Sequence, residues 1–243
     1  MAESAYLPGL TIQTSGVLDS PRHSVLIRVT HWIHTLSFIA LVLSGIAILL
    51  AHPRLYWGET GAVGTPSLID LPLPFVLDVP IRGPGRYLHF LSAWVCVLTG
   101  LLYVLSGLFT RHFRKNLVPS KTDLGWKPIM RVVFSHARLK RPTEEESQSY
   151  NVLQRLTYLA VVFLLFPLMI ITDLAMSPAV TSVFPVIVNV FGGQQSARTI
   201  HFFVAVALVL FLLVHIAMVC LAGFKNRMRA MISGHTAARK EPS

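Results

Sequence analysis

Four long apolar stretches constrain the fold of this 243-residue chain more than any other feature. They cover residues 30–50, 87–109, 152–173 and 200–223. Each is close to the ~20 mainly apolar residues that a helix needs to cross a bilayer. The first, second and fourth contain no Lys, Arg, Asp or Glu, and the third carries only Arg155 near its start and Asp173 at its end. We therefore expect an all-α membrane protein, a four-transmembrane-helix bundle that forms one domain over residues 1–243.

The rest of the composition agrees with a membrane protein. Hydrophobic residues make up 53% of the chain and charged residues 13%, where soluble domains carry about 25%. A fifth apolar stretch, residues 176–191, is interrupted by Pro178 and Pro185, and we expect it to be a loop on the membrane or on neighbouring helices. The two cysteines, Cys96 and Cys220, both lie in apolar runs and form no CxxC or CxxCH motif, which excludes a disulfide framework and a covalently attached c-type haem.

A net charge of +10 is typical of a protein that binds nucleic acid or lies at a membrane surface. The positions of the basic residues decide between these two explanations. Nine Lys and Arg residues lie between positions 111 and 141 and five follow the last span, against three between the first two spans and one before the fourth. By the positive-inside rule, both termini and the central loop are predicted to be cytoplasmic. The first 29 residues show no signal-peptide pattern. We expect no nucleic-acid partner.

The central loop contains a helical pattern of its own. Apolar residues recur at helical spacing while basic residues take the other side: Trp126, Ile129, Met130, Val133, Phe134 and Ala137. This pattern predicts an amphipathic interfacial helix in the central cytoplasmic loop. One interpretation is that this helix binds anionic lipid or a partner protein. The alternative is that its basic residues only keep the loop on the cytoplasmic side of the membrane.

Five histidines lie within the apolar spans, where an ionisable side chain is costly and marks a candidate site. They are His31, His34, His89, His201 and His215. His201 and His215 are 14 residues apart, so on a helix they face the same way and are separated by roughly 21 Å. That distance is too long for one metal ion and suits two cofactors at different depths.

The predicted topology assigns partners to these two histidines. His89 begins the second span on the outer side, at the level of His201, and His31 begins the first span on the inner side, near His215. We expect one pair at each depth. His34, three residues after His31, is the rival for the inner pair.

An arginine precedes three of these histidines by three residues, on the same helix face. The pairs are Arg28 with His31, Arg86 with His89 and Arg198 with His201. A haem needs this combination, because its iron takes axial imidazoles while its propionates need cations. The alternative is that arginines flank any membrane helix. Small residues would let a flat macrocycle approach the backbone, or serve plain helix packing: Gly45, Ser92, Gly100 and Gly107.

At these residues the chain resembles the di-haem b-type cytochrome subunits of formate dehydrogenase, Ni,Fe-hydrogenase and thiosulfate reductase complexes, in the bacterial cytochrome b-561 superfamily. The likeness covers all four spans in order and implies a multi-pass protein of the bacterial cytoplasmic (inner) membrane. Its motifs are Arg28-x-x-His31-Trp32 with Leu43-Ser44-Gly45, Gly85-Arg86-x-x-His89, Tyr150-Asn151-x-x-Gln154, and His201 with His215.

The resemblance implies that His89 and His201 ligate an outer haem b, that His31 and His215 ligate an inner haem b, and that a quinone reacts beside the inner one. It also implies that Asn151 contacts the quinone. His34 departs from the family pattern and leaves the inner assignment open.

We therefore predict a haem-bearing electron-transfer subunit of a respiratory oxidoreductase complex, which does not itself select the substrate. It would link the quinone pool to a periplasmic redox subunit of molybdopterin, iron-sulfur or hydrogenase type. The alternative is a stand-alone cytochrome that acts as a superoxide:quinone oxidoreductase or a ferric reductase. A metal transporter would need acidic residues in mid-membrane and ligands at one depth, and a structural anchor would not explain five histidines.

Overall fold

The computed structural model describes residues 24–61, 64–71, 82–111, 113, 117–118 and 152–235. The elements within them, in chain order, are α1 (Val25–Ala51), β1 (Arg54–Leu55), β2 (Ile69–Asp70), α2 (Arg82–Phe109), α5 (Val152–Ala160), the π-helical turn η2 (Val161–Leu165), α6 (Phe166–Met176), α7 (Pro178–Thr181), α8 (Val186–Val190), α9 (Gln194–Leu221) and α10 (Phe224–Ser233).

Four helices of this part of the chain are long and apolar enough to cross a membrane. They are Val25–Ala51, Gly85–Phe109, Gln154–Met176 and Gln194–Leu221. The prediction of a four-helix membrane bundle is confirmed, and each helix extends somewhat beyond its apolar core. The amphipathic helix predicted at residues 126–137 lies outside the described residues, and the cytoplasmic placement of the termini stays a prediction.

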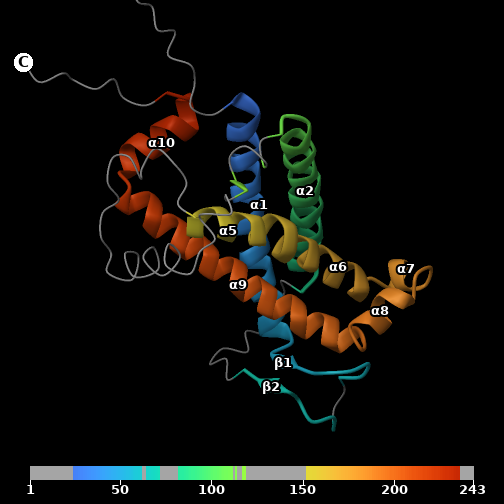
Figure 1. The fold of residues 1–243 in the computed structure, drawn as a ribbon. Coiled ribbons are helices and arrows are strands. Elements are labelled where there is room, and N and C mark those ends of the chain that lie inside the picture. The colour runs from blue at the N-terminus through green and yellow to red at the C-terminus, as the bar shows by residue number, and fades with distance from the viewer. Residues whose placement is uncertain are drawn as a thin grey trace, which may run out of the picture.

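The first two spans, α1 and α2, pack side by side (Figure 1). The buried residues of α1 are Thr30, Ser37 and Ser44, which are seven apart and so share one face. Leu36 and Leu43 of the same helix are exposed. Small polar residues inside and large apolar residues outside are what helices surrounded by lipid require, because close packing and hydrogen bonds hold them together.

The third span is one continuous helix made of α5, η2 and α6. Its π-helical turn precedes Pro167, which has no N–H to donate to the carbonyl four residues earlier and so disrupts the regular ladder there. α6 packs on α9. Between them, Val161 of η2 meets Val204 and Leu208 of α9 in a buried apolar cluster. This cluster joins the second half of the bundle.

A hairpin of β1 and β2 closes one end of the bundle over the start of α9. The Gly58 carbonyl accepts hydrogen bonds from the backbone N–H groups of Gln195 (3.0 Å) and Ser196 (3.3 Å), which caps α9. The Thr199 hydroxyl, which is fully buried, donates to the Tyr56 carbonyl at 2.6 Å. These bonds hold the segment that follows α1 on the first turns of α9.

The stretch expected to be a loop at residues 176–191 contains two one-turn helices, α7 and α8. The two prolines that interrupt its apolar run also begin these helices: Pro178 is the first residue of α7, and Pro185 precedes α8. Proline suits this place because the first N–H groups of a helix have no partner within it. Neither helix is long enough to span.

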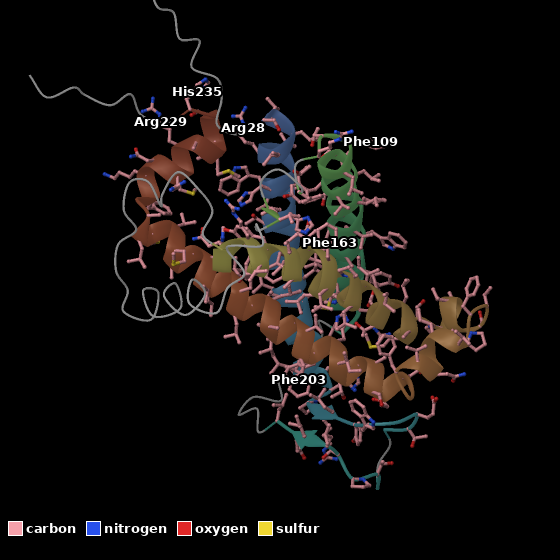
Figure 2. The ribbon with its side chains drawn as sticks, in the orientation of Figure 1. Arg28, Phe109, Phe163, Phe203, Arg229 and His235 are labelled. Carbon is pink, nitrogen blue, oxygen red and sulfur yellow. The ribbon has the colours of Figure 1, made fainter. Side chains whose placement is uncertain are left out.

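At the opposite end, α10 folds back on the start of α1 (Figures 1 and 2). The turn between α9 and α10 is made at Gly223, whose φ of 94° lies in the region that glycine adopts readily and other residues rarely adopt. Arg28 Nη1 donates to the Ile232 carbonyl at 2.7 Å, and Trp32 Nε1 donates to the Met231 carbonyl at 3.2 Å. The basic stretch after the last span therefore begins as a docked helix, which the sequence did not predict.

Candidate functional site

His89 lies on α2 and faces α1. Its Nδ1 is 2.9 Å from the hydroxyl oxygen of Ser44. A Cβ built on the neighbouring Gly45 would lie 3.5 Å from His89 Cε1, so the ring rests close to the backbone of α1. The Ser44-Gly45 motif therefore has a structural role: the serine binds the imidazole, and the glycine leaves the space beside it open.

His201 lies near the start of α9 and faces α6 in the same manner. Its Nδ1 is 3.1 Å from the hydroxyl oxygen of Thr172, which is fully buried. His89 is near enough to His201 to interact with it electrostatically, and Asp173 is near enough to interact with both. The two histidines predicted as the outer pair are thus brought together, and each of the four spans contributes a residue.

Each of these histidines also hydrogen-bonds a backbone group of the facing helix, His89 with Leu41 and His201 with Met169. In the side-chain hydrogen bonds among the described residues, both histidines use Nδ1 and neither uses Nε2. Phe203, two residues after His201, lies toward the hairpin end of the bundle (Figure 2). Two imidazole nitrogens are therefore available at this end, at the depth where the topology placed the outer pair.

His34 is engaged quite differently, because α2 binds both of its ring nitrogens. Nδ1 is 3.2 Å from the Thr99 hydroxyl and Nε2 is 3.2 Å from the Cys96 sulfur. Its ring also contacts Phe166 edge-on, with centroids 5.1 Å apart, and lies 3.3 Å from where a Cβ on Gly100 would be. This is the environment of a hydrogen-bonded packing residue between α1 and α2.

The other two span histidines make ring contacts within their own helices. His31 meets Trp32 edge-on at 5.5 Å, and His215 stacks on Phe211 at 5.9 Å. They lie toward the α10 end of α1 and α9 respectively. Their pairing with each other stays a prediction.

The three arginines lie at the ends of the bundle. Arg28 binds the end of α10, and Arg198 Nη2 donates to the His52 carbonyl at the end of α1, at 2.6 Å. Both contacts are favourable because the last carbonyls of a helix attract cations. Arg28 Nε is buried and has no hydrogen-bond partner among the described residues. Arg86 is exposed on the first turn of the second span.

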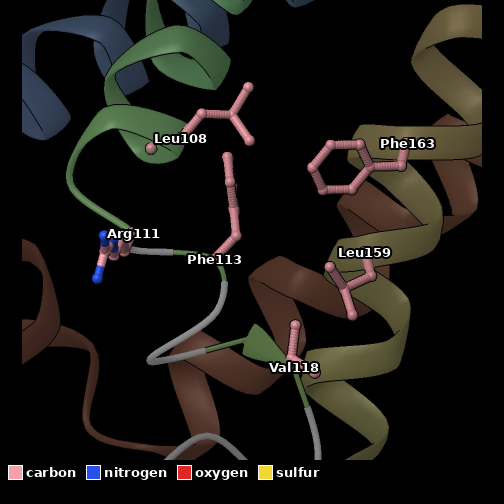
Figure 3. Close-up of a pocket in the computed structure, with 7 residues that line it drawn as sticks. Leu108, Arg111, Phe113, Val118, Leu159 and Phe163 are labelled. Carbon is pink, nitrogen blue, oxygen red and sulfur yellow. The ribbon is translucent and has the colours of Figure 1, made fainter.

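Two pockets lie near the α10 end of the bundle. One, of about 410 Å³, runs between α1 and α10 and includes Arg28 and Trp32. The other, of about 440 Å³, is lined by Leu108 and Phe113 on one side and by Leu159 and Phe163 on the other (Figure 3). Its one charged lining residue is Arg111. Asn151, the predicted quinone contact, lies outside the described residues, while Gln154 and Arg155 are half-buried in α5.

This donor set fits a haem. Within the described part of the chain, no three His, Cys, Asp or Glu side chains gather closely enough to hold a metal ion by themselves. A haem iron needs only axial ligands from the protein. Near the hairpin end, His89 and His201 provide two imidazoles and Gly45 leaves room beside one of them. At the α10 end, Arg28 has a buried donor that no described residue uses and that suits a carboxylate.

Four side chains that bind the histidines were not identified as site residues from the sequence: Ser44, Cys96, Thr99 and Thr172. Ser44 entered only as part of a motif. Hydroxyl residues are common in membrane helices, and the signal that separates these from the rest is their depth and rotation relative to a histidine on another helix. This information is available only once it is known which helices pack against each other.

Comparison with known proteins identifies the family. The family described as prokaryotic cytochrome b561 matches residues 22–234. The putative protein-methionine-sulfoxide reductase subunit YedZ1 of Azospira oryzae is 29% identical over 223 residues, which cover 88% of this chain and 96% of the relative. No solved structure matches the chain. With all four spans inside the family match, the chain belongs to the prokaryotic cytochrome b561 family and is a multi-pass b-type cytochrome of the inner membrane.

Proposed function

We propose that the chain carries electrons between the quinone pool and a periplasmic oxidoreductase through two non-covalently bound b haems. His89 and His201 hold the haem near the hairpin end, and His31 and His215 hold the one near the α10 end. The observation that carries this proposal is the convergence of His89 and His201 from α2 and α9, each bound through Nδ1 to a side-chain hydroxyl that leaves Nε2 outside that bond.

When bound, each haem b supplies one reversible one-electron carrier. The chain's own residues position it. The two imidazoles of a pair approach from separate helices, so they hold the bundle and the cofactor together. Arg28, Arg86 and Arg198 lie at the helix ends, where their guanidinium groups suit propionates. The buried, unused Nε of Arg28 supports this role at the α10 end.

The quinone site is proposed at the α10 end, which the positive-inside rule predicts to be cytoplasmic. Asn151, with Gln154 and Arg155, would bind the quinone head group at the start of the third span. The pocket of about 440 Å³ beside α5 supports this position, because apolar walls with one cation suit an apolar molecule with a polar head. Protons for quinone chemistry would then exchange with the cytoplasmic side.

The relative's name favours one direction of flow. It describes a subunit of a reductase. For this chain we propose the same arrangement, in which electrons run from a quinol at the α10 end toward a reductase that docks at the hairpin end.

Single histidine variants test the assignment. Haem is quantified per chain in purified protein, and the reduced-minus-oxidised spectrum is recorded. We expect His89→Ala and His201→Ala to lose the same haem, and His31→Ala and His215→Ala to lose the other. Retention of two haems in both His89→Ala and His201→Ala would overturn the proposal.

A further inference from the structure

The hydroxyl groups that bind His89 and His201 are themselves bound in the same way. The Ser44 hydroxyl donates to the Ala40 carbonyl at 2.6 Å, and the Thr172 hydroxyl donates to the Leu168 carbonyl at 2.8 Å. Each carbonyl lies four residues earlier in the same helix. Both hydroxyl groups are buried, Ser44 with 3% and Thr172 with 0% of its surface exposed.

This arrangement determines where the imidazole proton lies. A hydroxyl has one proton, and a backbone carbonyl can only accept. Because each hydroxyl gives its proton to its own helix, it meets the histidine with a lone pair, so His89 Nδ1 and His201 Nδ1 carry a proton and donate. A neutral imidazole with its proton on Nδ1 has a lone pair on Nε2. Both histidines are therefore held in the tautomer that binds a metal through Nε2.

We propose that Ser44 and Thr172 are positioning residues that hold His89 and His201 in the Nδ1–H tautomer, fix their ring orientation and set the redox potential of the haem bound between them. The inference rests on the proposed function, in which these two histidines are axial ligands. Partners of this kind raise the basicity of a metal-bound histidine. The two ligands of one iron are tuned alike, by one hydroxyl each from α1 and α6.

The direction of the effect follows from charge. A hydrogen bond accepted from Nδ1–H makes the imidazole a better electron donor, which favours ferric over ferrous iron. Loss of the hydroxyl therefore raises the midpoint potential of that haem. Loss of such a partner changes metal affinity by about 10–100-fold in metalloproteins. A tenfold change in the ferric preference corresponds to a shift of about 59 mV for one electron.

The test uses Ser44→Ala and Thr172→Val in the full chain, with optical redox titration of both haems. Each variant is expected to raise the midpoint potential of one haem, and both variants should affect the same haem. At a given solution potential, the ferric-to-ferrous ratio of that haem should fall by up to about tenfold, while the other haem is unchanged. Ser44→Thr and Thr172→Ser restore a hydroxyl and should restore the potential. Thr99→Val is the matched control, because Thr99 binds His34 in the same way and donates to the Val95 carbonyl at 2.7 Å.

Each outcome decides the question. If a variant loses that haem altogether, recovery of the haem in the hydroxyl-restoring variant supports the inference, and its failure overturns it. If both potentials stay at the wild-type value while His89→Ala loses a haem, the inference is wrong and the proposed function stands. If His89→Ala and His201→Ala keep both haems, the proposed function itself fails.

Discussion

Replacing His34 by alanine separates a haem ligand from a packing residue on the first helix. His31 and His34 are one turn apart, and the sequence left both open as the inner ligand. In the structure both nitrogens of His34 are bound to α2, at 3.2 Å from Thr99 and 3.2 Å from Cys96. We therefore expect His34→Ala to keep two haems per chain and His31→Ala to keep one.

The cost of His34→Ala to stability can be worked from its contacts. Hydrogen bonds between membrane helices average about 0.6 kcal/mol each, and an edge-on aromatic pair is worth about 0.5–1.5 kcal/mol. Two such bonds and the Phe166 contact sum to about 2 kcal/mol. For a chain of this size that lowers the Tm by about 4–8 °C.

The assay pairs haem quantification with thermal unfolding of the purified protein in detergent. His34→Ala should show the wild-type spectrum and a lowered Tm, and His31→Ala should show half the haem absorbance. The reasoning is refuted if His34→Ala loses a haem while His31→Ala retains both, because His34 would then be the ligand and its contacts to Thr99 and Cys96 would have to break on haem binding.

Three further changes probe separate parts of the molecule. Gly45→Ala adds a Cβ at an ordinary contact distance of 3.5 Å from His89, so the variant should keep both haems. Gly45→Leu overpacks the site at a cost of about 1–3 kcal/mol and should lose the outer haem. Its control, Gly100→Leu beside His34, should keep both haems. Arg28→Met removes the bond that docks α10, so proteolysis after α9 should accelerate while the outer haem spectrum is unchanged, and an altered outer haem would contradict this. Thr199→Val leaves the Tyr56 carbonyl buried without its donor and should cost about 1–3 kcal/mol in thermal unfolding; an unchanged Tm would show that the hairpin is not held by this bond.

The four spans were predictable because apolar length alone requires them. Their ends were not, since a helix continues through the polar interface wherever its backbone groups still find partners: α1 begins at Val25 with the Ser24 hydroxyl as its cap, and α9 begins at Gln194 under the Gly58 carbonyl. A carbonyl from a distant loop leaves no trace in the local sequence. The hairpin and the docking of α10 were missed for the same reason.

The depth of the candidate site in the membrane could be predicted from the sequence, but the side chains that contact its histidines could not. The level of His89 and His201 along their helices follows from topology and a rise of 1.5 Å per residue. The partners Ser44 and Thr172 depend on the rotation of each helix about its axis, which packing decides. The same applies to His34, whose two nitrogens could be assigned to Thr99 and Cys96 only once α1 and α2 were placed together.

Haem stoichiometry of the wild-type protein tests the central claim most directly. The measurement is a reduced-minus-oxidised optical spectrum of the purified chain together with haem extraction, after expression with adequate haem supply. Two b-type haems per chain with separable midpoint potentials are the predicted result. A single haem, or a colourless protein, would contradict the arrangement of two histidine pairs across the bundle.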